Sequence, residues 1–207
     1  MTTDENHTKA HRPNGDCPAT RHTCALWRGA AILVVSAWLC IVFAGRLQAS
    51  SPPPSASQVE TAMIFNMTRF VEWPGESFPA GNAPFTICVL GKGELAAAVG
   101  ALQGKTIKGR PAVVRQVSQV GEKEACQILV IDKSERRRLR TVLKQLNRNG
   151  VLTVSDAPRF ASAGGGVGFI EVDGRVAFEI NPEAVRQCRI KISSQLLKLA
   201  HIVGDGE

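Results

Sequence analysis

The chain has 207 residues, of which 44% are apolar and 5% are aromatic, and its formal net charge is +7. This length predicts one domain, or at most two, and the apolar fraction excludes a disordered or collagen-like chain. Proteins that bind nucleic acids usually combine a basic patch with aromatic stacking residues, so the low aromatic content argues against a nucleic-acid partner.

An uncharged apolar stretch at residues 29–45 is followed by the small-residue cleavage signal Leu47-Gln48-Ala49. Basic residues precede the stretch: Lys9, Arg12, Arg21 and Arg28. This order predicts a secretory signal peptide over residues 1–49, and the alternative is an uncleaved N-terminal membrane anchor. Since more basic charge lies before the stretch than after it, both alternatives place the remaining chain outside the inner membrane, in the periplasm.

Residues 50–56 are rich in Pro and Ser and are expected to form a linker, followed by a single α/β domain over residues 57–204. Ser57 and Glu60 have the spacing of a capping box, which predicts the start of a helix. That helix is expected to stop near Trp73, because the residue before a proline is disfavoured in the α region.

The next segments alternate between buried-type strands and helices. Strands are predicted at residues 85–90, 111–117, 126–131 and 151–154. Helices are predicted up to about Leu102 and from Ser134 onward, with Ser134 as the N-cap. This order predicts a three-layer, mostly parallel, Rossmann-like sheet, with the N-terminal helix packed beside it.

The C-terminal part is predicted to contain an antiparallel hairpin, because residues 167–172 and 175–180 flank Asp173-Gly174, a pair that favours a type I′ turn. Asn181-Pro182 is expected to begin a short helix. A last apolar helix is predicted from its leucines, alanine and valine, with His201 in or at the edge of the core. Its apolar members are Leu196, Leu197, Leu199, Ala200 and Val203.

The segment from Gly91 to Ala96 matches a dinucleotide-binding fingerprint between a strand and a helix. No acidic residue follows in residues 95–121, where a ribose-binding carboxylate would be needed, so we predict a tight turn. After the apolar stretch, the chain also lacks Cys-x-x-Cys, His-x-x-x-His and Gly-x-Ser-x-Gly motifs. We therefore expect no cofactor, no metal site and no catalytic residues.

A basic stripe is predicted on the helix that starts at Ser134, because four cations are spaced by four residues. They are Arg136, Arg140, Lys144 and Arg148. The stripe is either an ordinary solvated face or a docking surface for an acidic protein or anionic lipid headgroups.

Asp132 and Asp156 end predicted strands, at the positions where α/β proteins bind ligands. For Asp132, a role in the turn before the next helix is the stronger expectation.

Cys88 and Cys126 fall on the first and third predicted strands, which are neighbours in a sheet of order 2-1-3. If the strand ends align, the two cysteines are offset by about 10 Å, whereas a disulfide needs Cα atoms within about 7 Å. Slack before the third strand would close that gap. The alternatives are therefore a disulfide or two buried free thiols.

Several short segments together resemble one protein family. They are residues 70–74 (FVEWP), 88–91 (CVLG), 105–111 (KTIKGRP), 126–131 (CQILVI), 152–156 (LTVSD), 164–166 (GGG), 178–181 (FEIN) and 192–197 (ISSQLL). In order and spacing they resemble the YfiR-like periplasmic proteins over about residues 57–203.

The resemblance implies a non-enzymatic periplasmic regulator that binds the periplasmic part of an inner-membrane diguanylate cyclase and holds it inactive, which lowers cyclic-di-GMP signalling and biofilm formation. It also implies a possible homodimer and a disulfide between Cys88 and Cys126. A second family disulfide is absent, because residues 160–163 contain no cysteine. We expect the partner to dock on Trp73, Pro74 and the basic stripe, although Trp73 is equally expected in the core.

The alternative function is a periplasmic small-ligand sensor that acts on another membrane partner, such as a histidine kinase. Its crevice would lie near Gly91, Asp132 and Asp156. An enzyme would need a cluster of titratable groups, which one histidine after the apolar stretch and scattered acids do not supply.

Overall fold

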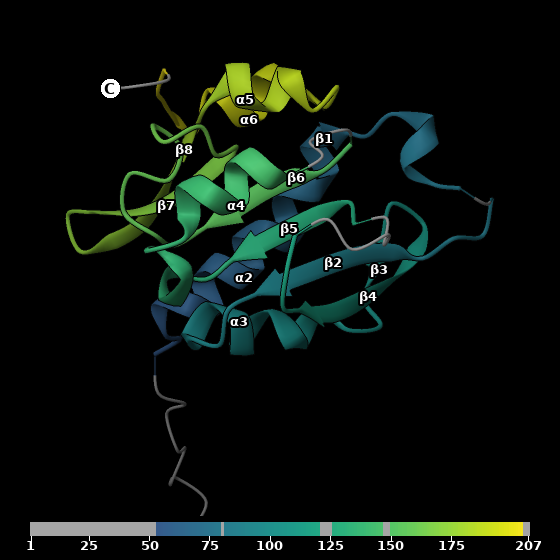
Figure 1. The fold of residues 1–207 in the computed structure, drawn as a ribbon, viewed down its shortest axis with the longest axis horizontal. Helices are drawn as coiled ribbons and strands as arrows, with labels where there is room; N and C mark the ends of the chain where they lie inside the picture. Colours follow the sequence, from purple (N-terminus) through teal and green to yellow (C-terminus); the bar gives the residue numbers. More distant parts are fainter. Residues whose placement is uncertain (1–52, 80, 121–125, 147–149, 205–207) are drawn as a thin grey trace, which may run out of the picture. The chain divides into compact units, whose positions relative to one another are not determined.

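The computed structural model describes residues 53–79, 81–120, 126–146 and 150–204, all within one unit, Pro53–Glu207 (Figure 1). The predicted signal peptide or anchor and the start of the linker lie outside these residues. Within the described ranges, no helix is both long and apolar enough to cross a membrane.

The central sheet has eight strands. The parallel strands at its centre are β2 (Phe85–Leu90), β4 (Arg110–Val117), β5 (Ile128–Ile131) and β6 (Leu152–Ser155). The other strands are β3 (Thr106–Ile107), β7 (Val167–Val172), β8 (Arg175–Ile180) and β10 (His201–Ile202). The order β10-β8-β7-β6-β5-β2-β4-β3 confirms the mostly parallel sheet and places the first three predicted strands in the order 2-1-3.

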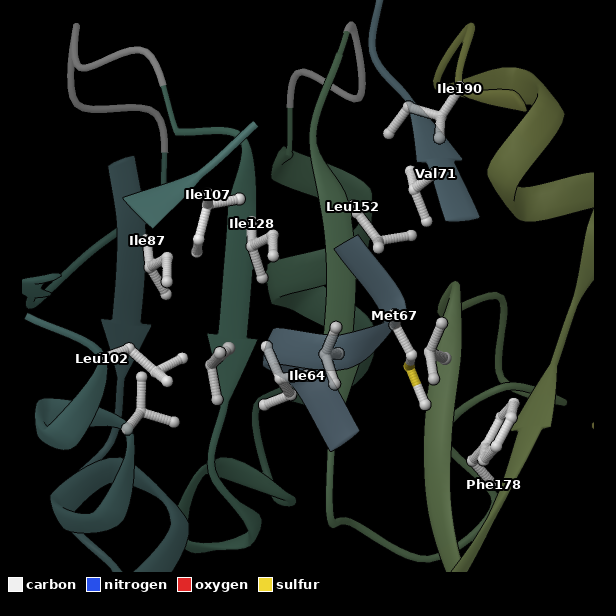
Figure 2. Close-up of a cluster of buried hydrophobic side chains, with 14 of the residues drawn as sticks. Ile64, Met67, Val71, Ile87, Leu102, Ile107, Ile128, Leu152, Phe178 and Ile190 are labelled. Carbon is white, nitrogen blue, oxygen red and sulfur yellow. The ribbon is translucent and has the colours of Figure 1, made fainter. Parts of the chain in front are cut away.

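Alternate residues of each central parallel strand are buried on opposite faces of the sheet. In β2, Ile87 and Val89 face the cluster under helices α2 (Ala56–Met67) and α3 (Glu94–Val99). Cys88 and Leu90 face the opposite cluster, under α4 (Leu139–Gln145) (Figure 1). Figure 2 shows Ile64 and Met67 of α2 among the strand side chains of the first face. Helices therefore cover both faces, which confirms the three-layer prediction.

The first helix begins earlier and ends earlier than predicted. Its N-cap is Ser55, whose side chain accepts from the Gln58 backbone N–H while the Gln58 side chain accepts from Ser55, so the capping box expected at Ser57 was wrong. Ser57 is buried inside the helix instead. After α2 comes the 3₁₀ helix η1 (Thr68–Phe70). The next residues form the short strand β1 (Val71–Glu72), which pairs antiparallel with β9 (Lys191–Ile192), so the helix ends before Trp73.

The C-terminal segment differs from its prediction at its last element. The hairpin is confirmed, with positive φ at Asp173 and Gly174 as a type I′ turn requires. Asn181 caps α5 (Pro182–Gln187), also as predicted. The predicted long apolar helix was wrong: α6 (Ser194–Leu197) is one turn, and His201 lies exposed on β10 beside β8.

Three further 3₁₀ helices connect these elements: η2 (Gly75–Ser77), η3 (Gly100–Leu102) and η4 (Lys133–Glu135).

Candidate functional site

The carboxyl ends of β2, β5 and β6 meet at one edge of the sheet, followed by Gly91, Asp132 and Asp156 in turn. Asp132 is fully buried. Its Oδ1 accepts a hydrogen bond of 2.8 Å from the Ser134 backbone, and its Oδ2 accepts one of 3.2 Å from the Ala96 backbone. Asp132 therefore ties the start of η4 to the first turn of α3, which is the turn role expected for it.

The pKa of Asp132 reflects these contacts. Burial alone would raise the pKa, but hydrogen bonds from Ser134 and from the backbones of Ala96 and Gly93 outweigh it and hold the pKa below its ordinary value. Asp132 is therefore charged at neutral pH, and its charge lies at the N-terminal end of α3.

The glycine loop before α3 is shaped around this carboxylate. Gly91 has φ +104°, and a Cβ built there would lie 2.8 Å from the Asp132 Cβ. A Cβ built on Gly93 would lie 2.6 Å from Asp132 Oδ2. In a dinucleotide site the pyrophosphate occupies the helix N-terminus. Here the Asp132 carboxylate occupies that place, so the glycines serve the close approach of two loops.

Two further carboxyl groups, those of Asp156 and Glu60, lie near Asp132. Asp156 Oδ1 accepts a hydrogen bond of 2.6 Å from the Lys133 backbone, and Lys133 Nζ lies 3.7 Å from Asp156 Oδ2. Burial nevertheless raises the pKa of Asp156. Burial, followed by the charge of Asp156, raises the pKa of Glu60 to about 7. No pattern in the sequence indicates that Glu60 of α2 lies near this edge.

We expect Glu60→Gln to flatten the pH dependence of stability. The folded-state pKa of about 7 lies above the ordinary 4.5, so the wild-type domain loses stability as pH rises through this interval. After allowance for solvent screening of a half-exposed group, the loss is about 1–2 kcal/mol. Urea unfolding at pH 5 and pH 8 measures it, with Glu171→Gln, an exposed glutamate of the hairpin, as the control. An unchanged slope in Glu60→Gln would contradict the assignment.

The predicted basic stripe is only partly helical. Asp132, not Ser134, is the N-cap, and it begins the short η4 instead of a long helix. Arg136 lies in the turn that precedes α4, whereas Arg140 and Lys144 share α4. Arg148 lies outside the described residues. The apolar face of α4 is buried through Leu139, Val142 and Leu143.

A cavity of about 470 Å³ adjoins this basic segment. Arginines from two separate segments line it: Arg136, Arg137, Arg140 and Arg159. Arg159 was not among the predicted site residues, because neither its left-handed backbone, with φ +56°, nor its place beside the other arginines has a signal in the sequence.

Trp73 is half-buried and makes specific contacts within the fold. Its Nε1 donates a hydrogen bond of 2.9 Å to the Gln127 carbonyl, and its ring packs edge-on against Phe85 at a centroid distance of 5.0 Å. Pro74, which follows it, is also half-buried. These contacts give Trp73 a packing role, and its part in partner docking stays a prediction.

The structure joins Cys88 and Cys126 in a disulfide with a Cα–Cα distance of 5.8 Å. Cys88 pairs with Leu129 in the sheet register, so the anticipated offset of the strands is present. The chain bends at Gln127 before β5 begins, and this brings Cys126 close to Cys88. The chain that precedes β5 therefore closes the gap, and of the two alternatives the structure has the disulfide. The third cysteine of the domain, Cys188, is buried, and its Sγ donates to the Ala184 carbonyl.

Gln127, which was not among the predicted site residues, holds this bend in place. Its side chain is buried. Its Oε1 accepts a hydrogen bond of 2.6 Å from the Thr86 backbone, and its Nε2 donates one of 2.5 Å to the Ser77 carbonyl. Since its own carbonyl accepts from Trp73, Gln127 links the Trp73 segment, β2 and the disulfide-bonded segment.

Comparison with known proteins agrees with the resemblance noted in the sequence. A family model described as YfiR/HmsC-like matches residues 57–201, which run from α2 to the first residue of β10. Proteins of this family are periplasmic regulators in cyclic-di-GMP signalling, and the family is regulatory, not catalytic. No curated protein matches the chain significantly.

Proposed function

The chain belongs to the YfiR/HmsC-like family, and on this premise we propose that it is a periplasmic, non-enzymatic regulator that binds the periplasmic sensor part of an inner-membrane diguanylate cyclase and inhibits it. The match over residues 57–201 carries the proposal, because it spans nearly every described element. To inhibit, the domain must bind the inactive state of the cyclase more tightly than the active state.

The proposed docking surface is the basic segment that ends in α4. Arg136, Arg140 and Lys144 are exposed, and within the described residues none of them has an acidic partner. Exposed cations of this kind steer an acidic partner and select its orientation. Arg148, Trp73 and Pro74 remain candidate contributors to docking, as predicted from the sequence.

Charge reversal tests this surface. The double variant Arg140→Glu/Lys144→Glu is expected to weaken capture of the cyclase from membranes at least tenfold, because two attractive charges become repulsive. The salt dependence of the remaining binding should also fall. Binding is measured by titrating the immobilised chain with solubilised cyclase at two salt concentrations.

The matched control is Arg175→Glu/Lys198→Glu, which makes the same change in net charge at two exposed residues of the hairpin and the α6 end. It should bind as the wild type does. Equal weakening in both double variants would mean a general charge effect, and unchanged binding in Arg140→Glu/Lys144→Glu would remove this surface from the proposal.

A ligand-sensing role on another membrane partner, such as a histidine kinase, is the second candidate, and the arginine-lined cavity is the observation that favours it. This cavity differs from the crevice expected near Gly91, Asp132 and Asp156. At that edge of the sheet lie two other hollows, one of about 540 Å³ lined by Gly93 and Asp132 and one of about 520 Å³ lined by Gly91. A homodimer remains a prediction under either function.

A further inference from the structure

The cavity beside the basic segment, here called the arginine pocket, is built from two parts of the chain. Residues 136–140 supply Arg136, Arg137 and Arg140, and residues 158–163 supply Arg159 and the half-buried Ser162. Its volume of about 470 Å³ falls within the range of small-molecule sites. Four arginines that are exposed at the surface thus line one cavity, although they come from two separate segments of the chain.

The arginines of the pocket form no ion pair within the described part of the chain. Among the nearby acids, Glu135 pairs with Arg138 at 2.7 Å and Asp156 with Lys133 at 3.7 Å, whereas Asp132 lines a neighbouring cavity together with Arg136 and Arg137. Within the described residues, no acid pairs with the four arginines of the pocket. Like charges gathered around a cavity repel one another, and a bound anion relieves that repulsion.

The second wall of the pocket is held rigidly. Phe160 is fully buried, and the Ala161 carbonyl accepts a hydrogen bond of 3.0 Å from the Asn181 side chain. The Gly165 backbone donates to the Phe160 carbonyl at 3.0 Å. Arg159 directly precedes these anchored residues and has φ +56°, a conformation that is costly for a residue with a Cβ and that is concentrated at ligand-binding sites. The fold thus maintains an unfavourable backbone that presents Arg159 on a fixed turn.

We propose that the arginine pocket binds a small ligand that carries a multivalent oxyanion, a phosphate or polycarboxylate group. The planar guanidinium presents paired donors that match the oxygens of either group. A concave site of this size fits a small ligand. This inference does not rest on the proposed function, since it concerns the isolated chain.

Thermal unfolding of the purified chain with sodium pyrophosphate, inorganic phosphate or citrate tests the pocket, with sodium chloride at equal ionic strength as the reference. At ten times its Kd, a specific probe should raise Tm by about 3–6 °C above the chloride reference. A response to the two phosphates alone assigns phosphate chemistry, and a response to citrate alone assigns a polycarboxylate. Both results support the proposal.

Two variants make the test specific to the pocket. Arg159→Gly removes one cation while allowing the left-handed backbone, so this variant should fold, and Arg137→Gln removes a second cation that is not part of the predicted stripe. Each should reduce the Tm response at least by half, whereas Arg175→Gln, on the hairpin, should retain it. A response equal to that of chloride, or equal in all variants, overturns the proposal, and so does binding of an acidic protein without any response to the small probes.

Discussion

The double variant Cys88→Ala/Cys126→Ala is expected to lose about 4 kcal/mol of unfolding free energy, because the bond closes a loop with a sequence separation of 38. In the chain-entropy account, the disulfide restricts the unfolded chain, so its removal makes unfolding more favourable. The bond also joins Cys88 of the sheet to the segment that Gln127 holds in place. Equilibrium unfolding in urea, without reductant, measures the loss.

The control for the disulfide is the response to reductant. Dithiothreitol should destabilise the wild-type chain by a similar amount and leave the double variant unchanged, since Cys188 is not in a disulfide. If dithiothreitol has no effect on the wild-type chain, the bond is absent from the protein in solution or contributes little to its stability.

The variant Asp132→Ala is expected to cost about 3–5 kcal/mol, because it removes a buried carboxylate and leaves two part-buried backbone donors without their acceptor. The donors are the N–H groups of Ser134 and Ala96, and the same change removes a charge at the N-terminal end of α3. Urea unfolding measures the loss. The matched control is Glu94→Ala, which removes an exposed carboxylate at the same edge and should cost less than about 1 kcal/mol.

The same contact can be tested from the glycine side. Gly93→Ala should destabilise the domain by about 2–3 kcal/mol, since its Cβ would overlap the Asp132 carboxylate. Gly100→Ala, at the end of α3, meets nothing within 4 Å and should be neutral or slightly stabilising. Equal stability of Gly93→Ala and Gly100→Ala would show that the loop is not closed around Asp132.

Sequence patterns predicted those parts of the fold that have a clear periodicity or a specific turn. The apolar runs gave β2 and β5, and Asp173-Gly174 gave the hairpin, because each pattern favours one local structure. The strands β1, β9 and β10 have two residues each, too few for a period, and exist through pairing with distant segments. The N-cap was misplaced by two residues, because both Ser55 and Ser57 are followed by a suitable partner three residues later.

The candidate site was harder to predict than the fold. The spacing of Arg136, Arg140 and Lys144 suggested one helix face, but the Asp132 cap begins a 3₁₀ turn and displaces Arg136 from the helix. Arg159 lies at the arginine pocket and Glu60 lies near Asp156 because of tertiary packing, which no local pattern in the sequence predicts. The loop at Gly91 was predicted as a tight turn, and the structure adds its cause, the approach of Asp132.

The measurement that tests the proposed function most directly is the cellular level of cyclic-di-GMP in a strain that lacks this gene, compared with its parent and a complemented strain. The account predicts a rise that complementation reverses, and a weaker reversal when the complementing gene encodes Arg140→Glu/Lys144→Glu. An unchanged level, under conditions where immunoblotting shows the protein in the parent strain, would contradict inhibition of a diguanylate cyclase.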